Sequence, residues 1–141
     1  MTNLNNHPES VSVRVPATAA NLGPGFDSIG MAVDLWSELT VTRGPFEVTI
    51  EGDGADVLPT DEGNLVVAGA RAAYNARGAE FPNLKFHCVN EIPFARGLGS
   101  SSAAIVSGIV AGFALQGDGT DPHEALLLAA EIEGHPDNVA P

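Results

Sequence analysis

The sequence has 141 residues, and its 6 basic and 18 acidic side chains give a formal net charge of −12. Because 44% of the residues are apolar, the chain is expected to form one globular domain rather than a disordered acidic tail. Lys85 is the only lysine and the five arginines are scattered, which argues against a nucleic-acid-binding protein. The single cysteine, Cys88, rules out a disulfide within the chain and favours a reducing, cytoplasmic location.

Residues 97–117 are the one place to look for a membrane span, since they carry no charge. Their continuous apolar part, residues 103–115, is only 13 residues long, which is typical of a buried core helix. Gly108 and Gly112 form a GxxxG pair there, and this pair favours close packing against a neighbouring element of the same domain. Residues 1–10 have no signal-peptide pattern and are expected to form a disordered tail, so no membrane association is predicted.

Alternation of apolar and polar residues predicts strands in the first half of the chain. Alternating valines indicate a strand over residues 11–15 that ends at Pro16. Two further strands, residues 36–43 and 46–51, follow one another across Gly44-Pro45 and predict a β-hairpin. Clusters of glycine, proline and polar residues predict loops over residues 16–28, 52–63 and 93–99.

The second half of the chain is predicted to be mainly helical. Asn64 is a suitable N-cap for a helix over residues 65–77, which Gly78 would end. The other segments are predicted as a strand over residues 84–92, an apolar helix from Ser100 or Ser101 to about Gln116, and a helix from Asp121-Pro122 to about Glu133. This order predicts one α+β domain over residues 11–141, without the regular βαβ alternation of a doubly wound sheet.

The segment PFARGLGSSSAA, residues 93–104, joins a predicted strand to a predicted helix through a glycine loop. A helix N-terminus presents unpaired N–H groups and the positive end of the dipole, so an anion is its natural ligand. Gly97 and Gly99 let the backbone approach phosphate oxygens, and the three serines can donate to phosphate or coordinate a metal ion. The sequence matches neither the Walker loop nor the dinucleotide fingerprint. The alternative is a Gly-Ser linker that only caps a core helix.

A further alternative is that residues 99–103 are a near match to the GxSxG nucleophile elbow, with Ser101 as the nucleophile of a serine hydrolase. A catalytic histidine would then have to follow in the chain, and only His123 and His135 do so. The predicted order of elements argues against this hypothesis, because the elbow is built on a parallel α/β sheet.

Two other segments group polar side chains. Asn21 and Asp27 stand in a loop of small and apolar residues, which suits recognition of a small polar molecule, although an Asx-turn would use the same residues. The other segment has two carboxylates at the end of a predicted helix and further polar groups after it, namely Glu131, Glu133, His135, Asp137 and Asn138. Such groups can supply an oxygen ligand to Mg²⁺, whereas their spacing is wrong for zinc.

Three segments together resemble the GHMP family of small-molecule kinases, and within it the homoserine kinases. They are VRVPATAANLGPGFDSIGMAVDL, PFARGLGSSSAA and EIEGHPDNVAP, which begin at Val13, Pro93 and Glu131. The resemblance implies an α+β fold of the ribosomal protein S5 domain 2-like type. It also implies transfer of the ATP γ-phosphoryl group to the hydroxyl of L-homoserine, with Mg²⁺, in threonine biosynthesis. A mevalonate-pathway or shikimate-type member of the family is the alternative, against which HPDNVAP argues.

The resemblance also implies roles for particular residues. The ATP phosphates would lie on Pro93, Phe94, Ala95, Arg96, Gly97, Leu98, Gly99, Ser100, Ser101, Ser102 and Ala103. Ser101 and Glu133 would hold Mg²⁺, with Glu131 as the substitute for the glutamate. The homoserine site would contain Asn21, Asp27, His135, Asp137 and Asn138, with Asp27 on the amino group. Asp137 and Asn138 would orient the reacting hydroxyl, in a reaction that depends on positioning more than on a strong base.

The chain is shorter than the kinases that it resembles. We expect it to be their N-terminal ATP-binding domain without the C-terminal domain, and to have little or no activity alone. The partner implied is L-homoserine, with a homodimer left open and with no nucleic acid or membrane involved.

Overall fold

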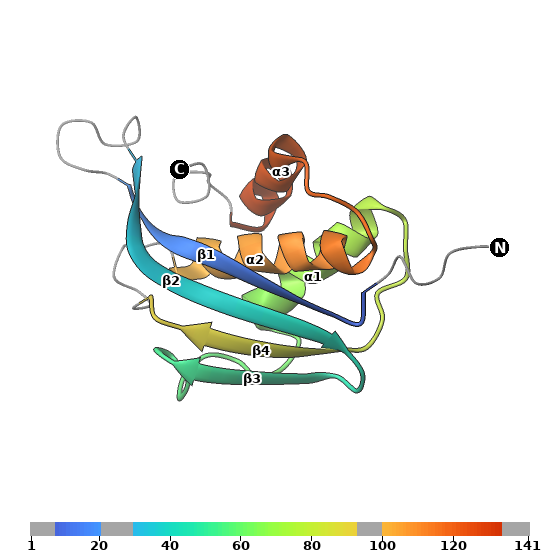
Figure 1. The fold of residues 1–141 in the computed structure, drawn as a ribbon, viewed down its shortest axis with the longest axis horizontal. Helices are drawn as coiled ribbons and strands as arrows, with labels where there is room; N and C mark the ends of the chain where they lie inside the picture. Colours follow the sequence, from blue (N-terminus) through green and yellow to red (C-terminus); the bar gives the residue numbers. More distant parts are fainter. Residues whose placement is uncertain (1–7, 21–29, 93–99, 134–141) are drawn as a thin grey trace.

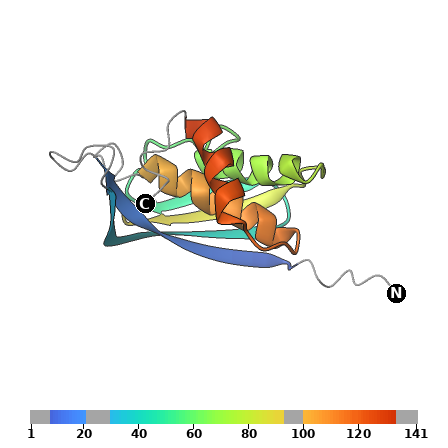
Figure 2. The ribbon, with the colours of Figure 1, turned by 90° about the horizontal axis from the view of Figure 1, so that it is seen from above.

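The structure, a computed structural model, describes residues 8–20, 30–92 and 100–133. In these residues a four-stranded sheet has helices on one of its faces (Figures 1 and 2). The elements are β1 (Ser10–Ala20), β2 (Gly30–Arg43), β3 (Glu47–Gly52), α1 (Leu65–Ala76), β4 (Leu84–Asn90), α2 (Ser100–Leu115) and α3 (Pro122–Glu133). The mixed α+β class is therefore as predicted.

The strand order of the sheet is β1-β2-β4-β3, so the predicted hairpin between the second and third strands is wrong. β4 lies between them, antiparallel to β2 and parallel to β3. The reason is burial. Leu84, Phe86 and Cys88 of β4 are all nearly inaccessible to solvent, and a central position in the sheet gives β4 a neighbouring strand on each side. The parallel pair needs a crossover connection, and α1 supplies it.

The first strand continues past Pro16 to Ala20, so the prediction that it ends at Pro16 is also wrong. β1 is an edge strand, where the missing N–H of a proline leaves no ladder hydrogen bond unmade. The register shifts between Pro16, opposite Trp36, and Ala17, opposite Val33. This irregularity takes up the mismatch that the proline introduces and lets pairing resume beyond it.

The helix boundaries agree with the sequence signals. The Asn64 side chain accepts a hydrogen bond of 3.0 Å from the Val66 N–H and so caps α1. Gly78 follows α1 with a φ of +66°, which glycine adopts without steric cost. At α3, the Asp121 carboxylate accepts from the His123 N–H at 3.1 Å, which caps that helix in the same way.

The predicted close packing of the GxxxG pair is confirmed, and its partner is α1. A Cβ added at Gly108 would lie 2.3 Å from the Val66 carbonyl oxygen, and one at Gly69 would lie 2.4 Å from the Ile105 carbonyl oxygen. Gly112 meets α1 farther along, at Ala73, so the residue numbers rise together in both helices. α1 and α2 therefore run in the same direction and start at the same end of the molecule.

The third helix lies on the far side of the helical layer from the sheet. Figure 2 shows α3 crossing α2, and its buried residues Ala125 and Ala129 join a cluster with Ile105 and Phe113 of α2. The last residue of α3 thereby returns to the beginning of α2. None of the helices described is both long and apolar enough to cross a membrane.

Candidate functional site

The site is built where α1 and α2 begin. Because the two helices are parallel, the positive ends of their dipoles lie at the same end of the molecule. Neither helix has an acidic residue in its first turn that would neutralise this end. The backbone N–H groups of a first turn lack intrahelical partners, so an anion placed here gains both hydrogen bonds and a favourable field.

A carboxylate from the third helix reaches this end. Ser101 Oγ donates a hydrogen bond of 3.0 Å to Oε1 of Glu133, which joins the first turn of α2 to the last residue of α3 across 32 positions of the chain. Ser101 is exposed and Glu133 is half-buried, while the neighbouring Glu131 is exposed. Of the two glutamates considered from the sequence, the structure brings Glu133 to the serine.

This pair fits a magnesium ion in the type and spacing of its donor atoms. Mg²⁺ prefers oxygen ligands in octahedral geometry at about 2.1 Å, so neighbouring ligand oxygens lie about 3 Å apart. The hydroxyl and carboxylate oxygens are separated by 3.0 Å. Within the described ranges no group of three or more His, Cys, Asp or Glu side chains is placed to hold a metal ion. Mg²⁺ usually takes its remaining ligands from substrate phosphates and water.

The next two residues of the predicted phosphate loop face the interior. Ser102 is 1% exposed, and its hydroxyl has no hydrogen-bond partner among the described residues. Ala103 is 4% exposed and packs with Ala17 and Ile92. Both residues can meet a phosphate through their backbone N–H groups, while the Ser101 hydroxyl reaches the open side of the helix.

A cavity of about 420 Å³ opens beside Ser101. This volume is in the usual range for small-molecule sites, and the walls are mainly apolar, as such sites are. Four parts of the chain form it: β2, the loop before α1 together with the first turn of α1, the last residues of β4 with Ile92 after them, and the first turns of α2. The lining residues that matter most below are Leu58, Pro59, Asn64, Cys88, Asn90 and Ser101.

Two polar residues hold the cavity walls together. Asn64 uses both ends of its side chain, since Oδ1 caps α1 while Nδ2 donates to the Pro59 carbonyl oxygen at 2.7 Å. Asn90 Nδ2 donates to the Asp53 carbonyl oxygen at 3.3 Å.

The cavity wall also contains the single cysteine. The thiol of Cys88 is buried in the wall, and this desolvation raises its pKa to about 11. The wall therefore contains a neutral thiol at physiological pH.

Sequence reasoning missed this cavity. The sequence predicts residues 52–63 only as a loop, and most of them are exposed. However, Leu58 and Pro59 are an apolar pair in an otherwise acidic segment, and they face the cavity. That pair was the available signal.

Several residues predicted for the site lie outside the described residues. They are Asn21, Asp27, the loop 93–99, His135, Asp137 and Asn138.

The structure also bears on the serine hydrolase alternative. His123, one of the two histidines considered for it, is in the first turn of α3, ten residues and about 15 Å of helix from Glu133. The hydrogen bond of Ser101 goes to a carboxylate and not to a histidine.

The chain is similar to known small-molecule kinases. A curated homoserine kinase of Carboxydothermus hydrogenoformans is 49% identical over 133 residues, which are 93% of this chain and 44% of that protein. A crystal structure of homoserine kinase from Cytophaga hutchinsonii matches all of the chain and 47% of its own, with a TM-score of 0.83 and 30% identity. The mevalonate kinase of Methanococcus jannaschii shares the fold, with a TM-score of 0.71 at 18% identity.

The chain spans less than half the length of the curated relatives that it matches. The family model described as the GHMP kinases N-terminal domain matches residues 64–141, which is more than half of the chain. That match contains the capped helix α1, the glycine loop and the Ser101–Glu133 pair. The chain therefore belongs to the GHMP kinase family and contains its N-terminal domain.

Proposed function

We propose that this protein transfers the γ-phosphoryl group of ATP to the side-chain hydroxyl of L-homoserine, and that the product is O-phospho-L-homoserine for threonine biosynthesis. The single observation that carries the proposal is the contact between Ser101 and Glu133 at the start of two parallel helices. The choice of homoserine among alcohols is supported by the 49% identity to homoserine kinases over 93% of the chain.

Each part of the nucleotide has a matching part of the site. The phosphates would lie over the first turn of α2, where unpaired N–H groups and two helix dipoles favour negative charge. The nucleoside would occupy the apolar cavity next to Ser101. In a phosphoryl transfer with a loose transition state, such placement supplies most of what the protein contributes.

Ser101 and Glu133 would hold Mg²⁺ between the helices and the phosphates. The ion, when bound, neutralises charge on phosphate oxygens. This role matters because the described part of the site has no lysine or arginine among its lining residues. Residues outside the described ranges, Asn21, Asp27, His135, Asp137 and Asn138, would bind homoserine, with Asp137 and Asn138 orienting its hydroxyl.

The test is ADP formation by the full-length protein with Mg-ATP, comparing L-homoserine with L-serine, mevalonate and shikimate. We expect homoserine to be preferred, and Asn21→Ala to raise the KM for homoserine while leaving the nucleotide affinity unchanged. If another alcohol were the preferred substrate, the kinase assignment would stand and the homoserine assignment would be wrong. Absence of ADP formation with every alcohol would contradict the proposal as a whole.

A further inference from the structure

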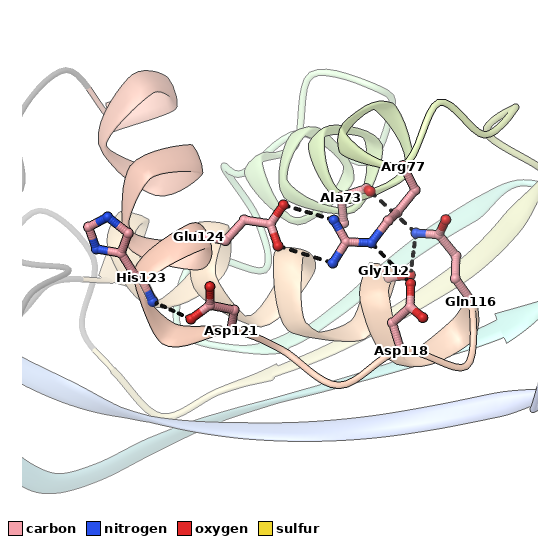
Figure 3. A network of polar contacts seen from close by, with 8 residues as sticks. All are labelled: Ala73, Arg77, Gly112, Gln116, Asp118, Asp121, His123 and Glu124. Atoms are coloured by element: carbon pink, nitrogen blue, oxygen red, sulfur yellow. Dashed lines mark hydrogen bonds and ion pairs between the residues drawn. The ribbon is translucent and has the colours of Figure 1, made fainter.

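Arg77 joins three elements at the end of the helices opposite to Ser101. Its two Nη atoms donate to both carboxylate oxygens of Glu124, at 2.8 and 3.0 Å, and its Nε donates to Asp118 at 3.1 Å (Figure 3). The guanidinium carbon also lies 4.3 Å from the centre of the Phe113 ring. We call Arg77, Phe113, Asp118 and Glu124 the Arg77 clamp. It links the end of α1, the end of α2 and the first turn of α3.

The clamp gives α3 a directional contact at its first turn. The buried residues of α3 are the alanines Ala125 and Ala129, the half-buried Leu128 and Ile132 pack beside them, and Leu127 is 54% exposed. Apolar contacts of this kind are non-directional, so they set the position of a helix more firmly than its direction. A bidentate pair between a guanidinium and a carboxylate fixes both distance and direction. Figure 3 shows this pair reaching α3 at its first turn.

The opposite end of α3 has the residue on which the proposed magnesium site depends. Glu124 and Glu133 are nine residues apart, which is about 13 Å along a helix. A rotation of α3 by about 5° about its first turn would therefore move Glu133 by about 1 Å relative to Ser101. A displacement of that size in a site that works by positioning has large effects on rate.

We propose that Arg77 is a positioning residue for the kinase reaction: the Arg77 clamp orients α3 so that Glu133 meets Ser101 at the metal site. This inference rests on the proposed function, because it concerns the same metal site. It differs from a role in stability alone, which would lower the unfolding temperature without a specific effect on metal binding.

The experiment measures Mn²⁺ binding to the full-length protein by electron paramagnetic resonance, in the presence of the non-hydrolysable nucleotide AMP-PNP. Arg77→Lys keeps the charge and loses the bidentate geometry. The matched control is Arg71→Lys on the same helix, since Arg71 pairs with Glu62 and packs on Phe81. We expect Arg77→Lys to weaken Mn²⁺ binding about tenfold and Arg71→Lys to leave it unchanged.

A double-mutant cycle shows whether Arg77 acts through Glu133. In a Glu133→Gln background, Arg77→Lys is expected to change the Mn²⁺ affinity less than about twofold, because the ligand that it positions is gone. The same factor in both backgrounds would overturn the inference, as would wild-type affinity in folded Arg77→Lys. If Arg77→Lys does not fold, Glu124→Gln takes its place, with the same expectations. Wild-type protein that binds no Mn²⁺ with AMP-PNP would instead contradict the proposed function.

Discussion

Gly108 of α2 lies against the backbone of α1, so close that a Cβ on Gly108 would stand 2.3 Å from the Val66 carbonyl oxygen. Gly69 makes the reciprocal approach from α1 to Ile105. These contacts let two helices pack backbone to backbone in parallel, and they place both N-termini at the cavity. The same glycines therefore serve packing and the electrostatics of the site.

Gly108→Ala is expected to destabilise the domain, because the clash is with backbone atoms that cannot rotate away. We expect a loss of at least about 2 kcal/mol in the free energy of unfolding. The control is Gly119→Ala, where nothing lies within 4 Å of the added Cβ and the change should stay within about 0.5 kcal/mol. Chemical denaturation of the two variants compares them directly. Equal stability would show that α1 and α2 can separate without cost.

Cys88 allows the cavity to be probed chemically. Because burial raises the pKa of its thiol to about 11, the reactive thiolate is scarce at neutral pH. Labelling by a disulfide reagent should therefore be slow in the folded protein and should speed up as the pH rises towards 11. Saturating Mg-ATP should slow it further if the nucleoside occupies the cavity that Cys88 lines. Unchanged labelling with bound Mg-ATP would place the nucleoside elsewhere.

The Arg77 clamp predicts a pH dependence with a definite sign. The hydrogen bond from Arg77 lowers the pKa of Glu124 below its ordinary value of 4.5. A carboxylate with a lowered pKa in the folded state contributes stability that is present above about pH 4.5 and is lost as the pH falls through the folded value. Glu124→Gln should therefore be less stable than wild type at pH 7, with the difference shrinking in acid. Thermal unfolding from pH 7 to pH 3 measures this, and a difference that grows in acid would contradict it.

Local signals predicted the helices well. Asn64, Gly78 and Asp121 act within their own turn of chain, so their effects follow from neighbouring residues alone. The order of the strands did not follow from such signals. The position of β4 between β2 and β3 depends on which strand has the most apolar surface to bury, and on a crossover of many residues.

Some features of the candidate site could likewise be predicted from local sequence, whereas others depend on the fold. The glycine loop and its serines form a contiguous pattern, so the prediction of a phosphate site there needs the sequence alone. The cavity could not be predicted, because its walls come from four parts of the chain that only the fold assembles. The contact of Ser101 with Glu133 lies between these cases. Both residues were named from the sequence, and α3 brings them together across 32 positions.

The proposed metal site is tested most directly by a Mg²⁺ titration of homoserine-dependent ADP formation by full-length wild type, Ser101→Ala and Glu133→Gln. We predict that both variants lose at least about 100-fold in kcat/KM and need much more Mg²⁺ for half-maximal rate. Glu131→Gln is the matched control and should behave as wild type, because Glu131 is exposed next to the pair. A wild-type response to Mg²⁺ in Ser101→Ala and Glu133→Gln would show that the pair does not hold the metal ion.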